Sequence, residues 1–434
     1  MPEFTIKSNE QGLFAGPAPS SGYHFINAQG FLTGDSSQAS ALKQINGLTS
    51  FSYSIQSNRE DISELGRREL VESVQISPPT VEINFDYNVY DLRNEVRLGL
   101  NPNFPTGGSQ LPYFDNNLEV FFFEGLTSES SSSKYSQSNW PYKDRDKRNL
   151  FFINGKKGED LVNMDESKLG DISVLAFGDC YLSSYSSNLT VGNIVTSSAS
   201  YISDNVSFHT SGSGTSPAIE PTGYTKVNDN IFKIPKTIDE VSSKSKIGLA
   251  THNMNPSTPL MCSDLLVSIK ATGYGNKQSD IKDIGYDFGA FSLQEVTFNT
   301  RFERREHIGM GYTVPIDRPM KYPIIVDATI SALVADSTTG EMRNLFNNDY
   351  KYDINIKSRN RQVACSGEAN PFVVLQYDLI NCRVNNIDFA NQVNGRATLG
   401  MTFSTDVADN VSGKGLFVSG KIIESGTVFS GFNF

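Results

Sequence analysis

The clearest pattern in the chain is a strict alternation of apolar and polar residues over 81–89, which read VEINFDYNV. Apolar side chains at every second position predict a β-strand with one face in a core and the other face in water. The alternation returns over 326–334, where Val326, Ala328 and Ile330 are separated by polar residues. Both segments follow a proline and run toward an aspartate, so the pair indicates an internal duplication.

Further alternating or apolar stretches predict more strands, each bounded by turn-forming residues. A short helix is expected through 94–98, with Asp91 as its N-cap and Gly99 at its end. The other expected strands lie at 51–55, 150–153 and 265–269, and in the tail at 416–418 and 421–423.

The second sign of duplication is an alignment of 180–201 with 382–403 that needs no gap. It pairs Cys180 with Cys382 and Tyr201 with Phe403, and earlier in the copies Pro78 aligns with Pro323. A shared bias toward Ser and Asn is the alternative source of these matches. We predict an N-terminal arm at 1–45, a first domain at 46–210, a linker or insert at 211–284 and a second domain with a C-terminal extension at 285–434.

Composition supports an all-β fold. The chain has 434 residues, enough for two or three domains, and its 28 Phe and 18 Tyr can fill real cores. Abundant Ser, Asn and Thr with 35 Gly, set between short alternating runs, favour strands and turns over helices.

A formal net charge of −11 argues against a surface that grips nucleic acid, although not against one that nucleic acid slides past. The start, Met1–Phe4, lacks the basic and apolar parts of a secretion signal, and no apolar run is long enough to cross a membrane. Four scattered cysteines predict neither a disulfide scaffold nor a zinc site, so a reducing cytoplasm is expected.

Catalytic and metal-binding patterns are missing from the sequence. The four histidines, His24, His209, His252 and His307, have no metal-ligand spacing, and no nucleophile elbow or phosphate-binding loop occurs. Cys180 and Cys382 are interpreted as core thiols. We therefore expect no enzyme activity, no cofactor and no metal.

Two charged loops stand out, each between the first two expected strands of a copy. The stretch 56–76 has three basic and five acidic residues, a balance of −2, whereas 301–321 has five basic and three acidic, a balance of +2. Either both are solvated hairpin tips, or complementary charge sets the register between neighbouring subunits. The candidate contact residues are Arg59, Glu60, Asp61, Arg67, Arg68, Arg301, Glu303, Arg304, Arg305 and Glu306.

Several segments share their pattern with a known family: GLTSFSYSI at 47–55, 59–66, 78–87, and 181–186 with 191–201, preceded by LFAGPAP at 13–19. On these segments the chain resembles the tail-tube (major tail) proteins of long-tailed bacteriophages, in a form with two tube domains in tandem. The segment 218–284 and the Ser-rich stretch near 130 depart from that pattern.

The resemblance implies two tandem β-sandwich domains, each with a short helix and a long charged hairpin loop, whose strands join an inner β-barrel in a ring. It implies a homotrimer that forms a pseudo-hexameric ring, and rings that stack into a tube for genome ejection. The implied partners are copies of itself, a tape-measure protein, a tail terminator and tail tip or baseplate proteins. Double-stranded DNA would pass without specific binding, and no stable membrane insertion is expected. The implied location is the virion, after assembly in the host bacterial cytoplasm.

The polar face of the alternating strands then gains a candidate role. If it lines the bore, Glu82, Asn84, Asp86, Asp327 and Thr329 face the DNA, and acidic groups there repel phosphate. The alternatives are an outward face or a face between subunits.

Other functions stay open on the sequence alone. Tube proteins of bacterial contractile injection machines are a close alternative. A receptor- or glycan-binding tail adhesin would use the loops rich in Tyr, Asn and Ser, and a glycan-cleaving tail enzyme would need a pair of carboxylates that no feature selects.

Overall fold

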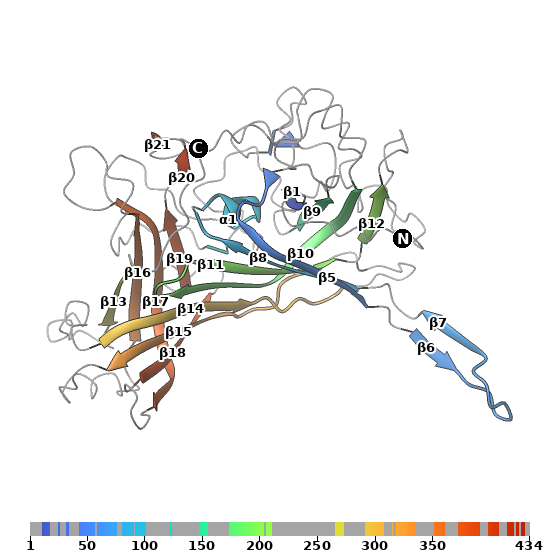
Figure 1. Ribbon diagram of the computed structural model, residues 1–434. Helices are drawn as coiled ribbons and strands as arrows, with labels where there is room; N and C mark the ends of the chain where they lie inside the picture. Colours follow the sequence, from blue (N-terminus) through green and yellow to red (C-terminus); the bar gives the residue numbers. More distant parts are fainter. Residues whose placement is uncertain are drawn as a thin grey trace.

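In the residues that it describes, the computed structural model consists almost entirely of antiparallel β-strands, with one short helix (Figure 1). This confirms the all-β prediction. The structure describes residues 11–17, 25–26, 32–33, 43–56, 59–75, 80–90, 92–100, 122–123, 147–154, 173–203, 205–210, 265–272, 291–307, 315, 318–334, 351–360, 372–390, 398–407, 415–420, 422–424 and 427–429.

The strands of the first copy form one antiparallel array in the order β5–β8–β11–β10, and β10 continues to β9 and β12. β9 pairs in turn with β1. Their bounds are β1 Gln11–Pro17, β4 Lys43–Gln44, β5 Leu48–Gln56, β8 Thr80–Asn88, β9 Lys147–Asn154, β10 Ser173–Thr190, β11 Thr196–Ser203 and β12 Asn205–Thr210.

The strands of the second copy repeat this order as β14–β15–β18–β17, with β16 and β19 on the far part of β17. β16 pairs with β13 along its whole length, although β13 lies inside the segment predicted as a linker. The bounds are β13 Leu265–Thr272, β14 Phe291–Arg301, β15 Ile324–Val334, β16 Lys351–Asn360, β17 Phe372–Ala390, β18 Thr398–Val407 and β19 Gly415–Gly420.

The register also repeats, residue for residue. Phe85 lies opposite Ala199, and their counterparts Ile330 and Met401 lie opposite each other in the second copy. The β-bulges coincide as well. The β5–β8 ladder shifts between Leu48/Ser50 and the β14–β15 ladder between Leu293/Glu295, while the two long hairpins shift between Leu182/Ser184 and Val384/Asn386. The predicted gap-free alignment of 180–201 with 382–403 therefore matches the strand pairing.

The two copies are joined edge to edge. Residues 184–190 of β10 pair with 295–301 of β14, which makes one continuous path of eight strands, β17–β18–β15–β14–β10–β11–β8–β5. In Figure 1 this path crosses the molecule, and β13, β16 and β19 stand at a steep angle to it at one end.

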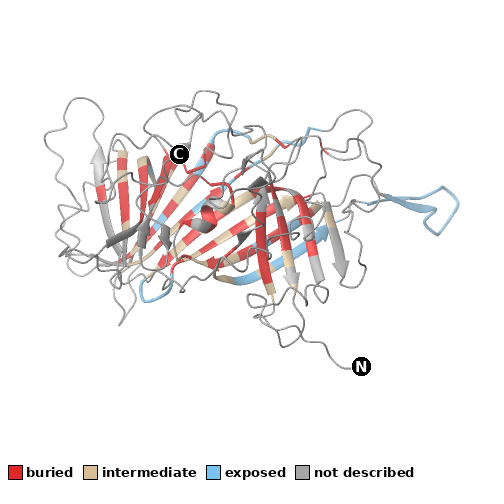
Figure 2. Ribbon diagram, turned by 90° about the horizontal axis from the view of Figure 1, so that it is seen from above, coloured by how far each residue is buried: buried red, intermediate tan, exposed pale blue. Residues whose placement is uncertain are grey.

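The core lies between the eight-strand sheet and a second layer, because β10 and β17 are long enough to belong to both. The first part of β10 pairs with β9 and β12, and the first part of β17 with β16 and β19. Alternate residues of the strands are buried, as the banding in Figure 2 shows. Among the described residues one hydrophobic cluster runs through both copies, and the thiols of Cys180 and Cys382 lie buried in it, as predicted.

The helix α1 spans Arg93–Arg97 and ends as predicted at Gly99, whose φ of +89° is the left-handed conformation that favours glycine. A Cβ at Gly99 would collide with the guanidinium of Arg148, so a close approach also requires glycine here. Asp91, its predicted N-cap, lies outside the described residues.

The alternating strands predicted at 81–89 and 326–334 are confirmed as β8 and β15, with buried apolar and outward polar residues. The strands predicted at 51–55, 150–153, 265–269 and 416–418 are confirmed as β5, β9, β13 and β19, and 422–424 forms β20, which pairs with β21 Thr427–Phe429. β2 Phe25–Ile26 pairs with β3 Leu32–Thr33. The domain boundaries stay a prediction.

Candidate functional site

One face of the eight-strand sheet is mainly polar in both copies. In the first copy it carries Glu82, Asn84 and Asp86 of β8, which alternate with fully buried apolar residues. Register places these three beside the serines of the neighbouring strands, Ser54, Ser52 and Ser50 of β5 on one side and Ser200 and Ser198 of β11 on the other. The Ser50 hydroxyl donates to the Asp86 carboxylate.

The same face continues through the second copy. Asp327 and Thr329 of β15 alternate with buried Val326, Ala328 and Ile330. Asp327 lies opposite Asn299 of β14 and Ser404 of β18. The five residues predicted to share one surface therefore do lie on one face, but whether that face lines a bore stays a prediction.

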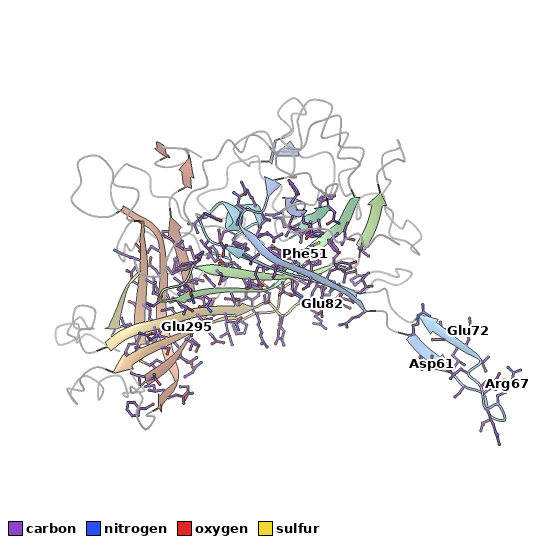
Figure 3. All side chains as sticks on the ribbon, viewed as in Figure 1. Phe51, Asp61, Arg67, Glu72, Glu82 and Glu295 are labelled. Atoms are coloured by element: carbon purple, nitrogen blue, oxygen red, sulfur yellow. The ribbon has the colours of Figure 1, made fainter. Side chains whose placement is uncertain are left out.

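The charge of this face is acidic. It exposes or half-exposes six carboxylates against two guanidinium groups, and most of its other side chains are hydroxyls and amides, with Ile202 and Ile325 as apolar exceptions. Burial raises the pKa of the Asp327 carboxyl, and the nearby charge of Arg301 partly offsets that rise. Among the residues labelled in Figure 3, Glu82 of the first copy and Glu295 of the second belong to this face. The charged residues are Glu82, Asp86, Glu295, Asp327, Asp388 and Asp406, with Arg301 and Arg383.

A separate feature is the hairpin of β6 Arg59–Ile62 and β7 Glu72–Gln75, which extends away from the body (Figures 1 and 3). Residues 59–74 are exposed throughout, as the pale blue hairpin in Figure 2 shows. Its apolar side chains are exposed too, and Leu65 at the tip, beside the turn glycine Gly66, is 104% exposed. The predicted contact residues Arg59, Glu60, Asp61, Arg67 and Arg68 all lie on it.

The matching stretch of the second copy, which we call the second-copy loop (residues 301–321), behaves differently. Arg304 Nε donates to the Leu182 carbonyl at 3.1 Å and Nη1 to the Arg318 carbonyl at 2.9 Å. The Arg304 guanidinium also lies 4.8 Å from the ring centre of Tyr181. Arg304 therefore holds the described part of this loop against the first copy.

The other predicted contact residues of that loop are placed individually. Arg301 lies on the polar face, at the end of β14. Glu303 accepts from Lys321 at 2.7 Å, and the buried Arg318 pairs with Glu306 at 2.9 Å. Arg305 is exposed. The ten residues therefore form two separated groups, and their role between rings stays a prediction.

A series of buried, hydrogen-bonded polar side chains crosses the joint between the copies. The sequence pattern did not predict it. Glu95 of α1 accepts from the hydroxyls of Tyr87 at 3.0 Å and Tyr185 at 3.4 Å. From Tyr185 the contacts continue through Ser197 and Ser187 to the Tyr377 hydroxyl of the second copy, each at 3.2–3.3 Å. Burial above all, and then the charge of Glu95, raises the pKa of Tyr87 and Tyr185. The apolar periodicity of these strands gave no sign of a buried acid on the neighbouring helix.

A second buried acid, Asp378, lies on β17. It accepts hydrogen bonds from Asn355 Nδ2 and, at 2.6 Å, from Gln376 Nε2. Burial raises the pKa of the Asp378 carboxyl to about 6, against the opposing effect of the two amides.

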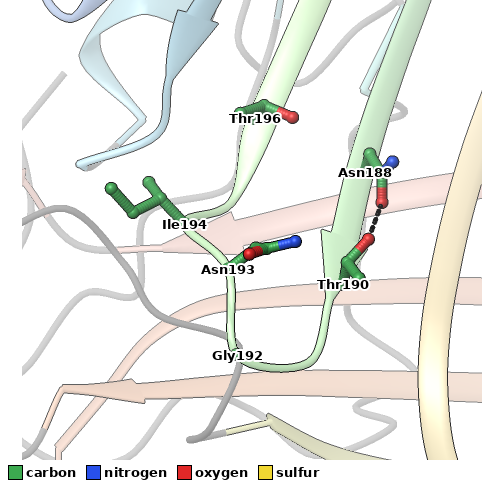
Figure 4. A pocket seen from close by; sticks show the side chains of 6 residues that line it. All are labelled: Asn188, Thr190, Gly192, Asn193, Ile194 and Thr196. Carbon is green, nitrogen blue, oxygen red and sulfur yellow. Dashed lines mark hydrogen bonds between the residues drawn. The ribbon is translucent and has the colours of Figure 1, made fainter.

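The surface also has an open hollow at the turn between β10 and β11 (Figure 4). The lining contains no carboxylate, imidazole or thiol, so it offers no group for acid–base or nucleophilic chemistry. The lining residues are Asn188, Thr190, Gly192, Asn193, Ile194 and Thr196.

Within the described part of the chain, no three His, Cys, Asp or Glu side chains gather closely enough to hold a metal ion. No helix in those same ranges has the length and apolar character needed to span a membrane.

Comparison with known proteins gives distant likenesses. No protein-family model matches the chain, and no curated protein matches it significantly. Among solved structures, it is similar to a chain of "Virion of native gene transfer agent (GTA) particle", with 13% identity, a TM-score of 0.22, and coverage of 36% of this chain and 95% of that one. It is also similar to "Crystal structure of Hcp protein", with 11% identity, a TM-score of 0.21, and coverage of 32% and 91%. These TM-scores are too low to place the chain in either family.

Proposed function

We propose that this protein is a structural subunit of a bacteriophage tail tube, in which copies of the chain join into rings and the rings stack. The observation that carries the proposal is the edge-to-edge joint between β10 and β14. It links two copies with the same register into one sheet, and both ends of the eight-strand path remain free to continue the same arrangement among the described strands.

Closure of such a sheet removes its edges, which would otherwise expose unpaired backbone groups. In the proposed ring three chains supply eight strands each. A barrel of that many strands, with ~4.8 Å between strands and a tilt of about 40°, is on the order of 45–50 Å across. Such a barrel leaves an aqueous channel with room for a DNA duplex.

The polar face supports a role as the wall of this channel. Six carboxylates against two guanidinium groups give it a negative potential, and most of its remaining side chains are small hydroxyls and amides. A negative wall repels phosphate, so DNA slides past without binding, whereas a basic wall would hold it. Glu82, Asn84, Asp86, Asp327 and Thr329 are the proposed wall residues.

The exposed hairpin supports the second part of the proposal, contact between successive rings. Leu65, Leu70 and Val71 are exposed on a segment that pairs with no other strand among the described residues. Burying such side chains against another subunit removes apolar surface from water. The surrounding arginines and acids would then set the register of the contact.

The same proposal gives the protein its place and partners. It would assemble in the host bacterial cytoplasm around a tape-measure protein, between a tail tip or baseplate and a tail terminator, and remain in the virion.

Electron microscopy of the purified protein tests the proposal directly. We expect rings and hollow tubes in negative stain, at high protein concentration or after seeding with tail tips. A monomer that stays monomeric under both conditions contradicts it.

The channel wall is tested separately by charge. Replacing Glu82 and Asp327 with lysine should leave tubes intact but slow DNA ejection, most strongly at low salt, because the phosphates then meet positive charge. The matched control is Glu82→Gln with Asp327→Asn, which removes the charge without reversing it and should have a smaller effect. Equal ejection rates in the lysine variant and wild type would show that this face does not line the path of DNA.

A further inference from the structure

The two ends of the eight-strand path are both open strands with exposed apolar side chains. β5 pairs with β8 alone among the described strands, and its Tyr53 and Ile55 are 41% and 45% exposed. At the other end, 383–390 of β17 pair with β18 alone within the described residues, and Phe389 is 56% exposed. Exposed apolar groups on a sheet edge indicate a surface that another strand covers.

The chain itself contains a strand pairing that shows how such an edge can be covered. In the joint between its copies, 184–190 of β10 pair antiparallel with 295–301 of β14. By the repeated register, the open part of β17 is the counterpart of that part of β10, and β5 is the counterpart of β14. The two open edges are therefore the two halves of the same joint, one at each end of the chain.

The burial of matched positions supports this assignment. Phe298 and Thr300 of β14, the counterparts of Tyr53 and Ile55, are each 1% exposed inside the joint. Ser187 of β10, the counterpart of Phe389, is also 1% exposed. The positions that the internal joint buries are the positions that the open edges leave exposed.

We propose that β5 of one copy of this chain pairs antiparallel with the end of β17 of the next copy, with Tyr53 opposite Phe389 and Ile55 opposite Ile387. This register follows from the pairs Ser187↔Phe298 and Tyr185↔Thr300 of the internal joint. The inference rests on the proposed self-assembly and adds to it the strands, the direction and the register of the contact between chains.

The difference in chemistry between the two joints agrees with their different tasks. The internal joint has a hydroxyl at each of these positions on β10, and Ser187 contacts the Tyr377 hydroxyl at 3.2 Å. Its two sides are held together by the same chain, so it needs no large favourable energy. A joint between separate chains must overcome the loss of translational and rotational freedom, and two apolar pairs supply that through burial.

Disulfide cross-linking tests the register. Cross-strand neighbours have Cα separations of about 4.5–5.5 Å, which a disulfide can span. We would prepare Tyr53→Cys and Phe389→Cys as separate proteins, mix them, allow assembly and oxidise. The expected product is a covalent dimer in the mixture and much less of it in either protein alone. Wild type under the same oxidant reports on the native thiols.

The matched control shifts the register by one residue. Ser54→Cys mixed with Phe389→Cys places the two thiols on opposite faces of the sheet, because side chains alternate along a strand. We expect little cross-linking from this pair. Equal cross-linking of both pairs, or of the control pair alone, would overturn the register.

A second measurement needs no cross-link. Phe389→Asp should raise the protein concentration needed for assembly about tenfold or more, because it puts a charge into the apolar contact. Ile325→Asp is the control, since Ile325 is 50% exposed on the polar face and away from both edges. It should change that concentration by less than about twofold. Equal effects of the two variants would overturn the inference.

These outcomes separate the inference from the proposed function. Rings and tubes that form without the Tyr53–Phe389 link, while Phe389→Asp still assembles normally, overturn this joint and leave the tube protein standing. A wild-type chain that never assembles overturns both.

Discussion

The β6–β7 hairpin and the second-copy loop occupy the same place in the two copies but lie differently. Each connects the first two strands of its copy, β5 to β8 and β14 to β15. The hairpin extends into solvent with every residue from 59 to 74 exposed, whereas the second-copy loop is fastened through Arg304 to β10 of the first copy. Equivalent strands thus carry one free loop and one fixed loop.

By the repeated register, the position that contacts the second-copy loop carries a different residue in the other copy. Arg59 is the counterpart of Arg304, and Arg383 is the counterpart of Tyr181. A guanidinium over a tyrosine ring is attracted to it, whereas a guanidinium over a second arginine is repelled. The contact that holds the second-copy loop would therefore be unfavourable for the hairpin at the proposed joint between chains. The comparison teaches that two copies with the same strands can differ in their loops. One loop contacts its own chain, and the other remains available for contact with another molecule.

The largest expected effect comes from removing the free loop. Replacing 59–75 with a short Gly-Ser connection should abolish tubes but keep rings and the melting temperature, because β6 and β7 pair only with each other among the described strands. Negative-stain microscopy and thermal unfolding measure the two results. Tubes of normal length in the deletion variant would contradict a role in stacking.

For the second-copy loop, we expect the main effect of a substitution to be a loss of stability and not a loss of tubes. Arg304→Ala removes two charged hydrogen bonds to carbonyls and the contact with Tyr181, so we expect the free energy of unfolding to fall by about 3 kcal/mol. The matched control Arg59→Ala, at the counterpart position, should change it by less than about 0.5 kcal/mol. Urea unfolding of unassembled protein measures both, and similar losses in the two variants would count against the difference between the loops.

A third difference between the copies is a buried carboxyl group whose protonation depends on pH. Asp378 on β17 corresponds in register to Ala176 on β10. Its pKa of about 6 lies above the value of about 3.9 in an unfolded chain, so folding favours the protonated form. This contribution to stability is present in full below about pH 4 and is lost as pH rises to about 6, by at most ~3 kcal/mol.

Asp378→Asn should therefore flatten the decline of stability between pH 4 and 6. Other carboxyls titrate in the same window, so the quantity to measure is the difference between variant and wild type. Asp388→Asn, an exposed carboxyl on the same strand, is the control. Parallel pH profiles for Asp378→Asn and wild type would show that this carboxyl does not remain protonated on folding.

The smallest expected effect concerns the charges of the hairpin itself. Glu64 and Arg67 lie 3.6 Å apart with both side chains about two-thirds exposed. Glu64→Gln should change the free energy of unfolding by no more than about 0.5 kcal/mol, because solvent screens such pairs. A larger loss in urea unfolding would mean that the hairpin depends on its ion pair for its shape.

Much of the frame could be predicted from local pattern. Strict alternation located β8 and β15, and the alignment of Cys180 with Cys382 anticipated both long hairpins. These features depend on neighbouring residues, and a one-residue shift would move the whole apolar set to the wrong face. The end of the helix at Gly99 was likewise visible, because a left-handed terminal residue strongly favours glycine.

The rest depends on contacts between distant segments. The β10–β14 joint pairs residues about a hundred positions apart, and no periodicity in either strand names its partner. The charge count predicted two equivalent loops of opposite charge, whereas the second-copy loop is held by Tyr181 and Leu182, which lie far from it in sequence. The burial of Glu95 was not predicted for the same reason, because the Tyr87 and Tyr185 hydroxyls that bind it come from other elements.

The matched bulges have a consequence for the size of the proposed ring. A bulge bends its strand and increases local twist, and each copy has one between its first two strands and one in its long hairpin, at equivalent positions. Each copy is therefore bent and twisted at the same places. Units joined through equivalent edges close into a ring when the turn per unit divides a full circle, and otherwise they wind into a helix. In the proposed ring, the positions at which each ladder gains one extra residue would thus help to set the diameter.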